Sequence, residues 1–401
     1  MESYSYILDI ALILLSTKLF GIISRKCQMP QVVGALFAGL ILGPACLNIV
    51  HETEFLTQLA EIGVILLMFF AGLETDVEEL KNSGKASLVI AILGIIVPLL
   101  GGFLVSLYFN REGVMPFSDN GNILLQNIFI GTILTATSVS ITVETLKEMG
   151  KLNSKVGNTI LGAAIIDDIL GIIALTVVIS CADSNVHLGI VLLKIVLFFL
   201  FAIFASAVFY KIFKYWMDKD AKNKRRYVIA VFAFCLLLAY ISEEYFGVAD
   251  ITGAFIAGLT VSSINKKYYI EEKLDIVSYA FLSPIFFASI GLKVVLPKMS
   301  AMLILFSICL TIVAVISKII GCGLGCKIFK YTNRECMQVG IGMVSRGEVA
   351  LIGANKGFNA GLISSGVLGP IIIVVIATTI LSPILLKMSY TYKTKQSFLL
   401  E

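Results

Sequence analysis

The chain has 401 residues, of which 58% are hydrophobic and 14% charged, and its mean hydropathy is +0.95. A soluble globular protein carries about 25% charged residues, so this composition excludes a soluble fold and predicts a polytopic membrane protein. The first residues include Glu2 and Asp9 rather than a basic stretch. We therefore expect the first apolar segment to be retained, not cleaved as a signal peptide.

The hydropathy pattern predicts an all-α fold. We expect thirteen apolar segments, each close to the roughly 17 to 25 residues with which a helix crosses a bilayer. In chain order they are 6–24, 30–47, 56–73, 86–109, 124–146, 155–180, 188–213, 227–243, 248–264, 274–292, 300–326, 335–355 and 361–387. Almost the whole chain is therefore expected to lie in or beside the lipid bilayer.

The distribution of Lys and Arg predicts the orientation, because cytoplasmic loops are enriched in these residues. When loops are assigned alternately from an outside N-terminus, 23 of the 31 Lys and Arg residues fall inside and four lie within segments. The outer loops receive only Arg111, Lys293, Lys298 and Lys356. We expect a cell-membrane protein with its N-terminus outside and its C-terminus in the cytoplasm. The basic stretch 219–226 is then a topology signal, and no nucleic-acid binding is expected.

Two short motifs occur twice in the chain at almost the same separation. Residues 34–40 read GALFAGL and residues 253–259 read GAFIAGL, while residues 69–73 read FFAGL and residues 286–292 read FFASIGL. The first six segments would then match the last six, with the seventh as a linker. Because the second copy begins seven segments after the first, an odd number, it enters the membrane from the opposite side. Inverted repeats of this kind build many secondary transporters, and the alternative is chance convergence of small-residue packing motifs.

The fifth segment of each copy is interrupted by residues that weaken a helix. Residues 131–140 read GTILTATSVS, and residues 340–348 read GIGMVSRGE. Interruptions at matching positions of two inverted halves are the best sequence indication of a substrate site. We expect two discontinuous helices whose half-helix ends present unpaired backbone groups and dipoles in mid-membrane.

Asp167 and Asp168 are adjacent in the middle of segment 155–180. A charge at this depth costs about 3 kcal/mol or more, so such a pair is kept only if it is paired, hydrated or used. Adjacent residues on a helix point about 100° apart, so the two carboxylates cannot both face one partner. Lys318 lies in the middle of segment 300–326 and needs a carboxylate partner of its own. One Asp is expected to pair with Lys318 while the other binds an ion in a cavity.

A small hard cation such as Na⁺ prefers oxygen ligands. Asp168, the hydroxyls of Thr137 and Ser138, and backbone carbonyls freed by the first break would supply them. The alternative is that these two hydroxyls only cap the break or bond back to it. If Na⁺ and H⁺ compete for the same carboxylates, Asp167 and Asp168, their exchange follows from mass action. The residues therefore predict a Na⁺/H⁺ antiporter, with Li⁺ or K⁺ as alternative cations, and neither a cofactor nor an enzymatic activity.

Other charged residues have secondary predicted roles. Arg346 and Glu348 flank the second break and are expected to neutralise half-helix dipoles and each other. Glu61, inside segment 56–73, either lines an outer funnel or has a hydrogen-bonded structural role. Cys322 and Cys326 are spaced by four residues without a further ligand nearby, which is typical of small core residues rather than a metal or disulfide site.

These motifs together resemble monovalent cation:proton antiporters of the NapA and Kef type, the cation:proton antiporter-2 family. The resemblance rests on the hydroxyl-rich break Thr135–Val139, the Asp167–Asp168 pair, Lys318 and the stretch Arg346–Glu348. It covers essentially the whole chain, and residues 34–44 and 72–76 are also similar to the family.

The resemblance implies a homodimer in which an ion-translocating core moves against a dimerisation scaffold. The implied dimerisation domain comprises 1–84 and 227–298, the core comprises 85–185 and 299–401, and 186–226 forms the linker helix and basic loop. It further implies that Asp168 carries the cation and proton, that Asp167 pairs with Lys318, and that exchange is electrogenic. The Kef type usually adds a cytoplasmic nucleotide-binding domain, which we expect to be absent here because the chain ends soon after its last segment.

Three other functions are open from the residues. A cation channel would need a continuous polar pore, whereas the charges here cluster at one depth. An intramembrane aspartyl protease needs two Asp residues that share a proton across a gap, and adjacent residues on one helix diverge. A Na⁺-coupled organic-anion symporter of similar fold is the third alternative.

Overall fold

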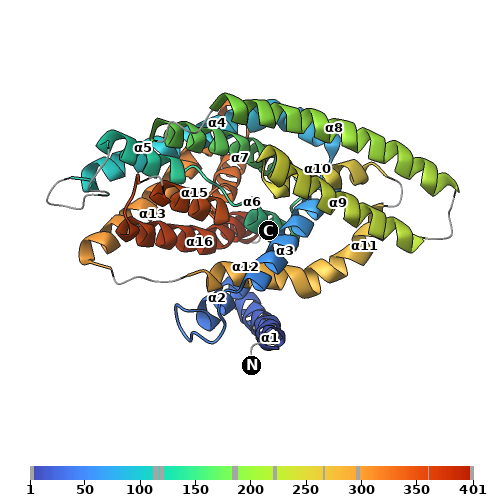
Figure 1. Cartoon of the computed structure of the whole chain (residues 1–401), viewed down its shortest axis with the longest axis horizontal. Helices are drawn as coiled ribbons and strands as arrows, with labels where there is room; N and C mark the ends of the chain where they lie inside the picture. Colours follow the sequence, from blue (N-terminus) through green and yellow to red (C-terminus); the bar gives the residue numbers. More distant parts are fainter. Residues whose placement is uncertain are drawn as a thin grey trace. The chain divides into compact units, whose positions relative to one another are not determined.

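The computed structural model of the protein describes residues 4–111, 117, 122–182, 188–219, 224–264, 267–294, 299–359 and 361–397. All regular secondary structure within these ranges is helical (Figure 1). Nine helices of the described residues are long and apolar enough to cross a membrane, by length and composition. The predicted all-α membrane fold is confirmed, and the number of thirteen crossings stays a prediction.

The helices follow the order of the predicted segments. They are α1 (Ser5–Lys26), α2 (Gln31–Leu42), α3 (Glu54–Glu74), α4 (Val77–Phe109), α5 (Ile123–Ile133), α6 (Val139–Glu148), α7 (Lys155–Ala182), α8 (Leu188–Lys219), α9 (Lys224–Phe246), α10 (Asp250–Ser262), α11 (Lys267–Val277), the π-helical turn η1 (Ser278–Leu282), α12 (Ser283–Leu292), α13 (Ala301–Ile328), α14 (Asn333–Gly342), α15 (Glu348–Asn359) and α16 (Ser365–Ser397). Two predicted segments are therefore divided, into α5 with α6 and into α14 with α15, whereas α11, η1 and α12 form one continuous span, Lys267–Leu292.

The start of α4 differs from the prediction, because the helix begins at Val77 rather than at residue 86. The Asp76 carboxylate accepts a hydrogen bond from the Glu78 N–H at 2.8 Å, and the Asp76 carbonyl accepts one from Leu80 at 2.9 Å. Asp76 thus caps a polar first turn. Hydropathy does not detect this turn, since its residues are hydrophilic.

The chain divides into two compact units. One comprises Met1–Phe20, Ala35–Leu80 and Gly189–Lys293, and the other comprises Gly21–Gly34, Lys81–Leu188 and Val294–Glu401. The residues with the strongest chemical predictions, Asp167, Asp168 and Lys318, all belong to the second unit. The assignment of dimerisation and ion translocation to separate domains stays a prediction.

In the first unit, four glycines of the repeated motifs bring helix backbones into contact. A Cβ on any of them would overlap backbone atoms of the helix opposite. The contacts are Gly39 with Ala288 (α2 and α12), Gly291 with Leu36 and Leu40 (α12 and α2), Gly72 with Phe255 (α3 and α10), and Gly258 with Phe69 (α10 and α3). Each contact joins a helix of the first predicted copy to a helix of the second.

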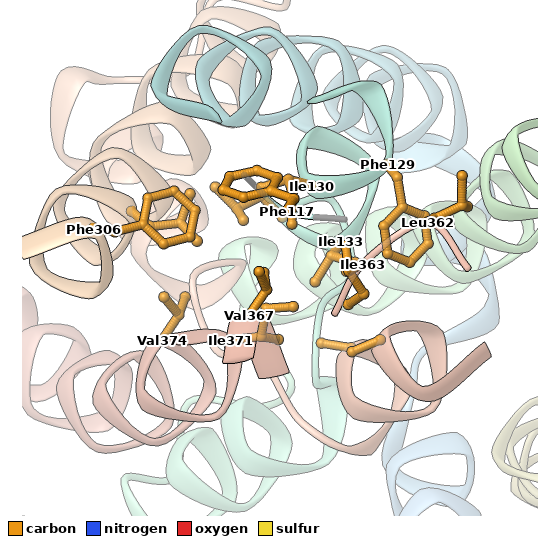
Figure 2. Close-up of a cluster of buried hydrophobic side chains, with 14 of the residues drawn as sticks. Phe117, Phe129, Ile130, Ile133, Phe306, Leu362, Ile363, Val367, Ile371 and Val374 are labelled. Carbon is orange, nitrogen blue, oxygen red and sulfur yellow. The ribbon is translucent and has the colours of Figure 1, made fainter. Parts of the chain in front are cut away.

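The second unit has a buried hydrophobic cluster around α5 and α15 (Figure 2). The Phe306 ring of α13 lies between those of Phe109 and Phe117, with centroid distances of 5.1 and 5.3 Å. The Phe129 ring of α5 packs directly on Gly357 of α15, where a Cβ would overlap the ring. The cluster also includes residues of α16, so it holds α5 and α15 against α13 and α16.

Candidate ion-binding site

Both predicted helix breaks are present in the second unit. The first interrupts the chain between the end of α5 at Ile133 and the start of α6 at Val139. The second lies between the end of α14 at Gly342 and the start of α15 at Glu348. The non-helical residues, 134–138 and 343–347, are those in which Thr, Ser and Gly interrupt the apolar pattern.

The two breaks are hydrogen-bonded to each other in a reciprocal way. The Ser138 N–H donates to the Ser345 carbonyl at 2.7 Å, and the Ser345 hydroxyl donates to the Ser138 carbonyl at 2.7 Å. Both residues are buried. The two extended segments are thus held side by side, although 207 residues separate them in the chain.

Arg346 is fully buried beside the breaks. Its guanidinium donates to the carbonyls of Val344 at 2.9 Å, Leu134 at 2.6 Å and Ala314 at 3.3 Å. Leu134 is the C-cap of α5, where unpaired carbonyls give a helix its partial negative charge. The positive charge of Arg346 therefore lies at the C-terminal end of α5. Its hydrogen bonds also connect the two breaks to α13.

Lys318 of α13 and Asp167 of α7 form a buried ion pair. The Lys318 ammonium donates to both oxygens of the Asp167 carboxylate, at 3.0 and 3.1 Å, and their side chains are 0% and 1% exposed. Gly94 of α4 borders the pair, because a Cβ there would stand 3.7 Å from Lys318 Nζ and 2.8 Å from Cys322 Sγ. The ion pair is thus enclosed by three helices and has the geometry that the family resemblance implies.

Asp168 follows Asp167 on α7 and is also buried, with 9% of its surface exposed. On a helix its carboxylate diverges from that of Asp167 by about 100°. The Lys318 ammonium donates hydrogen bonds to both oxygens of Asp167. The two neighbouring carboxylates therefore have different surroundings, as the sequence predicts.

Thr137 and Ser138 both lie in the first break and are buried. The Thr137 hydroxyl is 3.5 Å from the carbonyls of Thr135 and Met343, and it lies within hydrogen-bonding reach of Asp167. Ser138 is the N-cap residue of α6, yet its side chain makes no capping hydrogen bond. Its hydroxyl instead lies 3.3 Å from that of Ser140. The choice between an ion-ligand role and a purely structural role for these two hydroxyls stays a prediction.

The remaining predicted residues lie as follows. Glu348 begins α15, and its side chain is outside the described residues. Glu61 is exposed on α3 in the first unit, so its role in a funnel stays a prediction. Cys322 and Cys326 are free, buried cysteines on α13, which confirms their assignment as core residues. Within the described residues, no group of three or more His, Cys, Asp or Glu side chains is placed to hold a metal ion.

Sequence reasoning did not single out Thr142 or Ser345, which connect the two breaks. The Thr142 hydroxyl donates to the Gly342 carbonyl at 2.7 Å and lies 3.2 Å from the Ser345 hydroxyl. The available signal was position: Ser345 is inside the second break, and Thr142 lies one helical turn after Ser138. Both act through backbone carbonyls of distant residues, which a sequence does not reveal.

The chain is similar along its length to known antiporters. Residues 11–388 match the model of the family described as sodium/hydrogen exchanger, transmembrane. The chain is 40% identical to the Na(+)/H(+)-K(+) antiporter GerN of Bacillus cereus over 98% of each chain. It is 37% identical to a Na(+)/H(+) antiporter of Enterococcus hirae, over 97% of this chain and 98% of the relative.

A solved structure with the same fold extends this similarity. The sodium proton antiporter MjNhaP1 of Methanocaldococcus jannaschii, in its electron-microscopy structure, superimposes with a TM-score of 0.70 at 20% identity, covering 97% of this chain and 96% of that chain. The fold, the paired helix breaks and the family match agree. The chain belongs to the sodium/hydrogen exchanger family.

Proposed function

We propose that the protein exchanges Na⁺ for H⁺ across the cell membrane and that Asp168 is the group to which either ion binds. The observation that carries this proposal is the buried ion pair of Asp167 with Lys318, next to a second buried carboxylate that diverges from it. Lys318 binds both oxygens of Asp167, at 3.0 and 3.1 Å, while Asp168 points elsewhere from the same helix. Asp167 is the fixed counter-ion of Lys318, and Asp168 is the exchanging carboxylate.

The charges of the site suit a monovalent cation. The four described charged side chains, Asp167, Asp168, Lys318 and Arg346, sum to zero when all are ionised. Binding of one Na⁺ or of one proton at Asp168 gives the same net charge. The two ions are therefore electrostatically equivalent occupants, which favours exchange by competition over simultaneous binding.

The hydrogen bonding of the two breaks suggests that the backbone carbonyls that coordinate the cation belong to the first break. In the second break, the carbonyls of Gly342, Val344, Ser345 and Arg346 accept hydrogen bonds from Thr142, Arg346, Ser138 and Thr379. In the first, those of Leu134 and Ser138 accept from Arg346 and Ser345. Among the side-chain, turn and cap hydrogen bonds of the described residues, none is accepted by the carbonyls of Ala136 and Thr137. Thr137 is buried and Ala136 is half-buried. Carbonyls removed from water are nearly always paired, so a cation bound at Asp168 would give these two carbonyls a partner.

Finer features of the function follow from the family resemblance. We propose a NapA-like homodimer with the N-terminus outside and the C-terminus in the cytoplasm, in which the second unit carries the ion by alternating access. Electrogenic exchange, with more protons than Na⁺ ions moved per cycle, is also implied by the resemblance, and it requires a protonatable group besides Asp168, for which Lys318 is the candidate. Na⁺ is the proposed first substrate, and K⁺ is the second candidate, because the name of the relative GerN includes K⁺.

The test is exchange in proteoliposomes. A pH gradient is imposed across vesicles that contain the purified protein, and its collapse on addition of Na⁺, Li⁺ or K⁺ is followed with a fluorescent pH probe. We expect Na⁺ to collapse the gradient with the wild type and not with Asp168→Asn, while both proteins keep the same melting temperature. Full exchange by Asp168→Asn would overturn the assignment of this carboxylate. Cation flux without proton movement would instead indicate a channel.

A further inference from the structure

The hydroxyls of Thr142 and Ser345 form a bridge between the two helix breaks. Ser345 Oγ donates to the Ser138 carbonyl at 2.7 Å, Thr142 Oγ1 donates to the Gly342 carbonyl at 2.7 Å, and the two hydroxyl oxygens are 3.2 Å apart. Thr142 is 1% exposed and Ser345 is 0% exposed. Each residue therefore binds the backbone of the opposite break in a site closed to water.

Both hydroxyl protons of this bridge are already used in hydrogen bonds. Each hydroxyl carries one proton, and each proton already binds a carbonyl of the opposite break. The 3.2 Å contact between the two oxygens becomes a hydrogen bond only if Gly342 or Ser138 loses its donor. Removal of either hydroxyl takes a donor away from a carbonyl at the contact between the breaks, and the other hydroxyl of the bridge already uses its proton.

Gly347, in the second break, lies close to Ser138 of the first break. At Gly347, a Cβ would stand 2.7 Å from Ser138 Oγ and 2.9 Å from Ser138 Cβ. Only glycine allows the second break to lie this close to Ser138. The close approach brings the Ser345 carbonyl to 2.7 Å from the Ser138 N–H.

The bond at Ser138 N–H determines the direction of the Thr137 carbonyl. These two groups belong to one planar peptide unit, and the described chain contains no cis peptide bond. In a trans unit the N–H and the C=O point in opposite directions. Because the N–H points at Ser345, the Thr137 carbonyl points away from the second break. This backbone bond therefore aims one of the two carbonyls that the proposed function assigns to the cation, and the bridge stabilises the contact between the breaks in which the bond forms.

We propose that Thr142 and Ser345 are positioning residues that set the cation preference of the site. The inference rests on the proposed function and names the groups that decide between Na⁺ and a larger alkali cation. Selectivity among such cations depends on the distance, number and rigidity of the coordinating oxygens. A bridge that holds the Thr137 carbonyl in one position favours one ion size, and its loss lets the carbonyl adapt to others.

The chain offers a matched control in the same half-helix. Thr145 is 0% exposed, and its hydroxyl also donates to a carbonyl at 2.7 Å, but that carbonyl belongs to Ile141 of its own helix. Thr142→Val and Thr145→Val remove the same hydroxyl from equally buried positions one turn apart. Only the first substitution affects the contact between the breaks.

The experiment measures apparent KM for Na⁺, K⁺ and Li⁺ in the proteoliposome assay. We expect Thr142→Val and Ser345→Ala to move the ratio of the K⁺ and Na⁺ KM values toward unity by about three- to tenfold, the loss expected for about one hydrogen bond. Thr145→Val and the conservative Thr142→Ser should keep the wild-type ratio. A ratio unchanged in both Thr142→Val and Ser345→Ala would overturn the inference.

A second readout separates this inference from the proposed function. The rise in melting temperature on addition of each cation reports binding without transport, and it is measured for the same variants. Absence of coupled exchange in the wild type would reject the proposed function. A wild type that is stabilised unequally by Na⁺ and K⁺, together with a Thr142→Val variant stabilised equally, would still support the bridge. Equal cation-induced shifts in both proteins would reject it.

Discussion

Lys318 reaches across from α13 to hold both oxygens of Asp167 on α7, with 151 residues between them in the chain. Neither side chain has access to water, since they are 0% and 1% exposed. Two charges taken out of water stabilise a fold only while they remain together. The first prediction follows from this condition.

Replacement of Lys318 by Ala leaves Asp167 buried with one cation fewer. We expect the variant to lose about 3–5 kcal/mol of stability, the usual cost when one partner of a buried ion pair is removed. The measurement is the melting temperature of the detergent-solubilised protein at neutral pH. The double variant Lys318→Met with Asp167→Leu should lose less than Lys318→Ala alone, because no uncompensated charge remains. A Lys318→Ala protein that melts with the wild type would contradict this account.

Arg346 should not be replaceable by Lys. Its planar guanidinium donates to the carbonyls of Val344, Leu134 and Ala314, whereas a lysine ammonium is a compact point charge on a flexible stem. Arg346→Lys is expected to lower stability by about 1.5–3 kcal/mol for each hydrogen bond lost. The control is Arg334→Lys in the same unit, where the partly exposed guanidinium binds the Ser389 and Tyr390 carbonyls. Equal melting temperatures for the two variants would be evidence against a special role of Arg346.

Two glycines of α15 should respond oppositely to alanine. At Gly357 a Cβ overlaps the Phe129 ring, so we expect Gly357→Ala to cost about 1–3 kcal/mol through overpacking of the cluster in Figure 2. At Gly353 the nearest atom is a Leu175 methyl at 3.6 Å, an ordinary contact. Gly353→Ala should therefore be neutral or stabilising by up to about 1 kcal/mol, since alanine favours a helix. Both melting temperatures are measured under the same conditions, and a tolerated Gly357→Ala would mean that Phe129 moves freely.

Competition at Asp168 predicts how exchange depends on pH. Where the carboxylate is mostly protonated, each unit of decrease in pH should raise the apparent KM for Na⁺ about tenfold by mass action. The maximal rate at saturating Na⁺ should change much less, because enough Na⁺ displaces the proton. The measurement is ²²Na⁺ exchange in proteoliposomes with equal pH on both sides. A maximal rate that falls with pH at constant KM would show that the proton acts at another group.

The breaks and the ion pair were accessible from the sequence for simple physical reasons. Ser, Thr and Gly favour a helix less than Leu does. A cluster of them in the middle of an apolar segment therefore indicates a break. A lysine at the depth of Lys318 has few partners, and Asp167 and Asp168 were the obvious carboxylates. The choice between the two Asp residues came from the family resemblance.

Other features were not accessible, because they depend on which distant atoms meet. Thr142 and Ser345 are ordinary small polar residues until their hydroxyls are seen on carbonyls of the opposite break. The inverted repeat predicts equivalent breaks, but their hydrogen bonds differ. Thr379 donates to a carbonyl of the second break, and Arg346 donates to carbonyls of both breaks. The early start of α4 was missed because Asp76 caps a turn that carries no hydropathy signal.

The glycine contacts of the first unit have a consequence for the origin of the fold. Gly39 and Gly72 belong to the first copy and pack against helices of the second copy. Gly258 and Gly291 belong to the second copy and pack against helices of the first. Exchange of the two copies leaves this set of contacts unchanged, which is the property of an interface between two identical subunits. A half-length ancestor inserted in both orientations would have had the surfaces needed to pair with itself. Gene duplication and fusion would then have preserved an existing dimer contact, and neither half is expected to fold stably when expressed without the other.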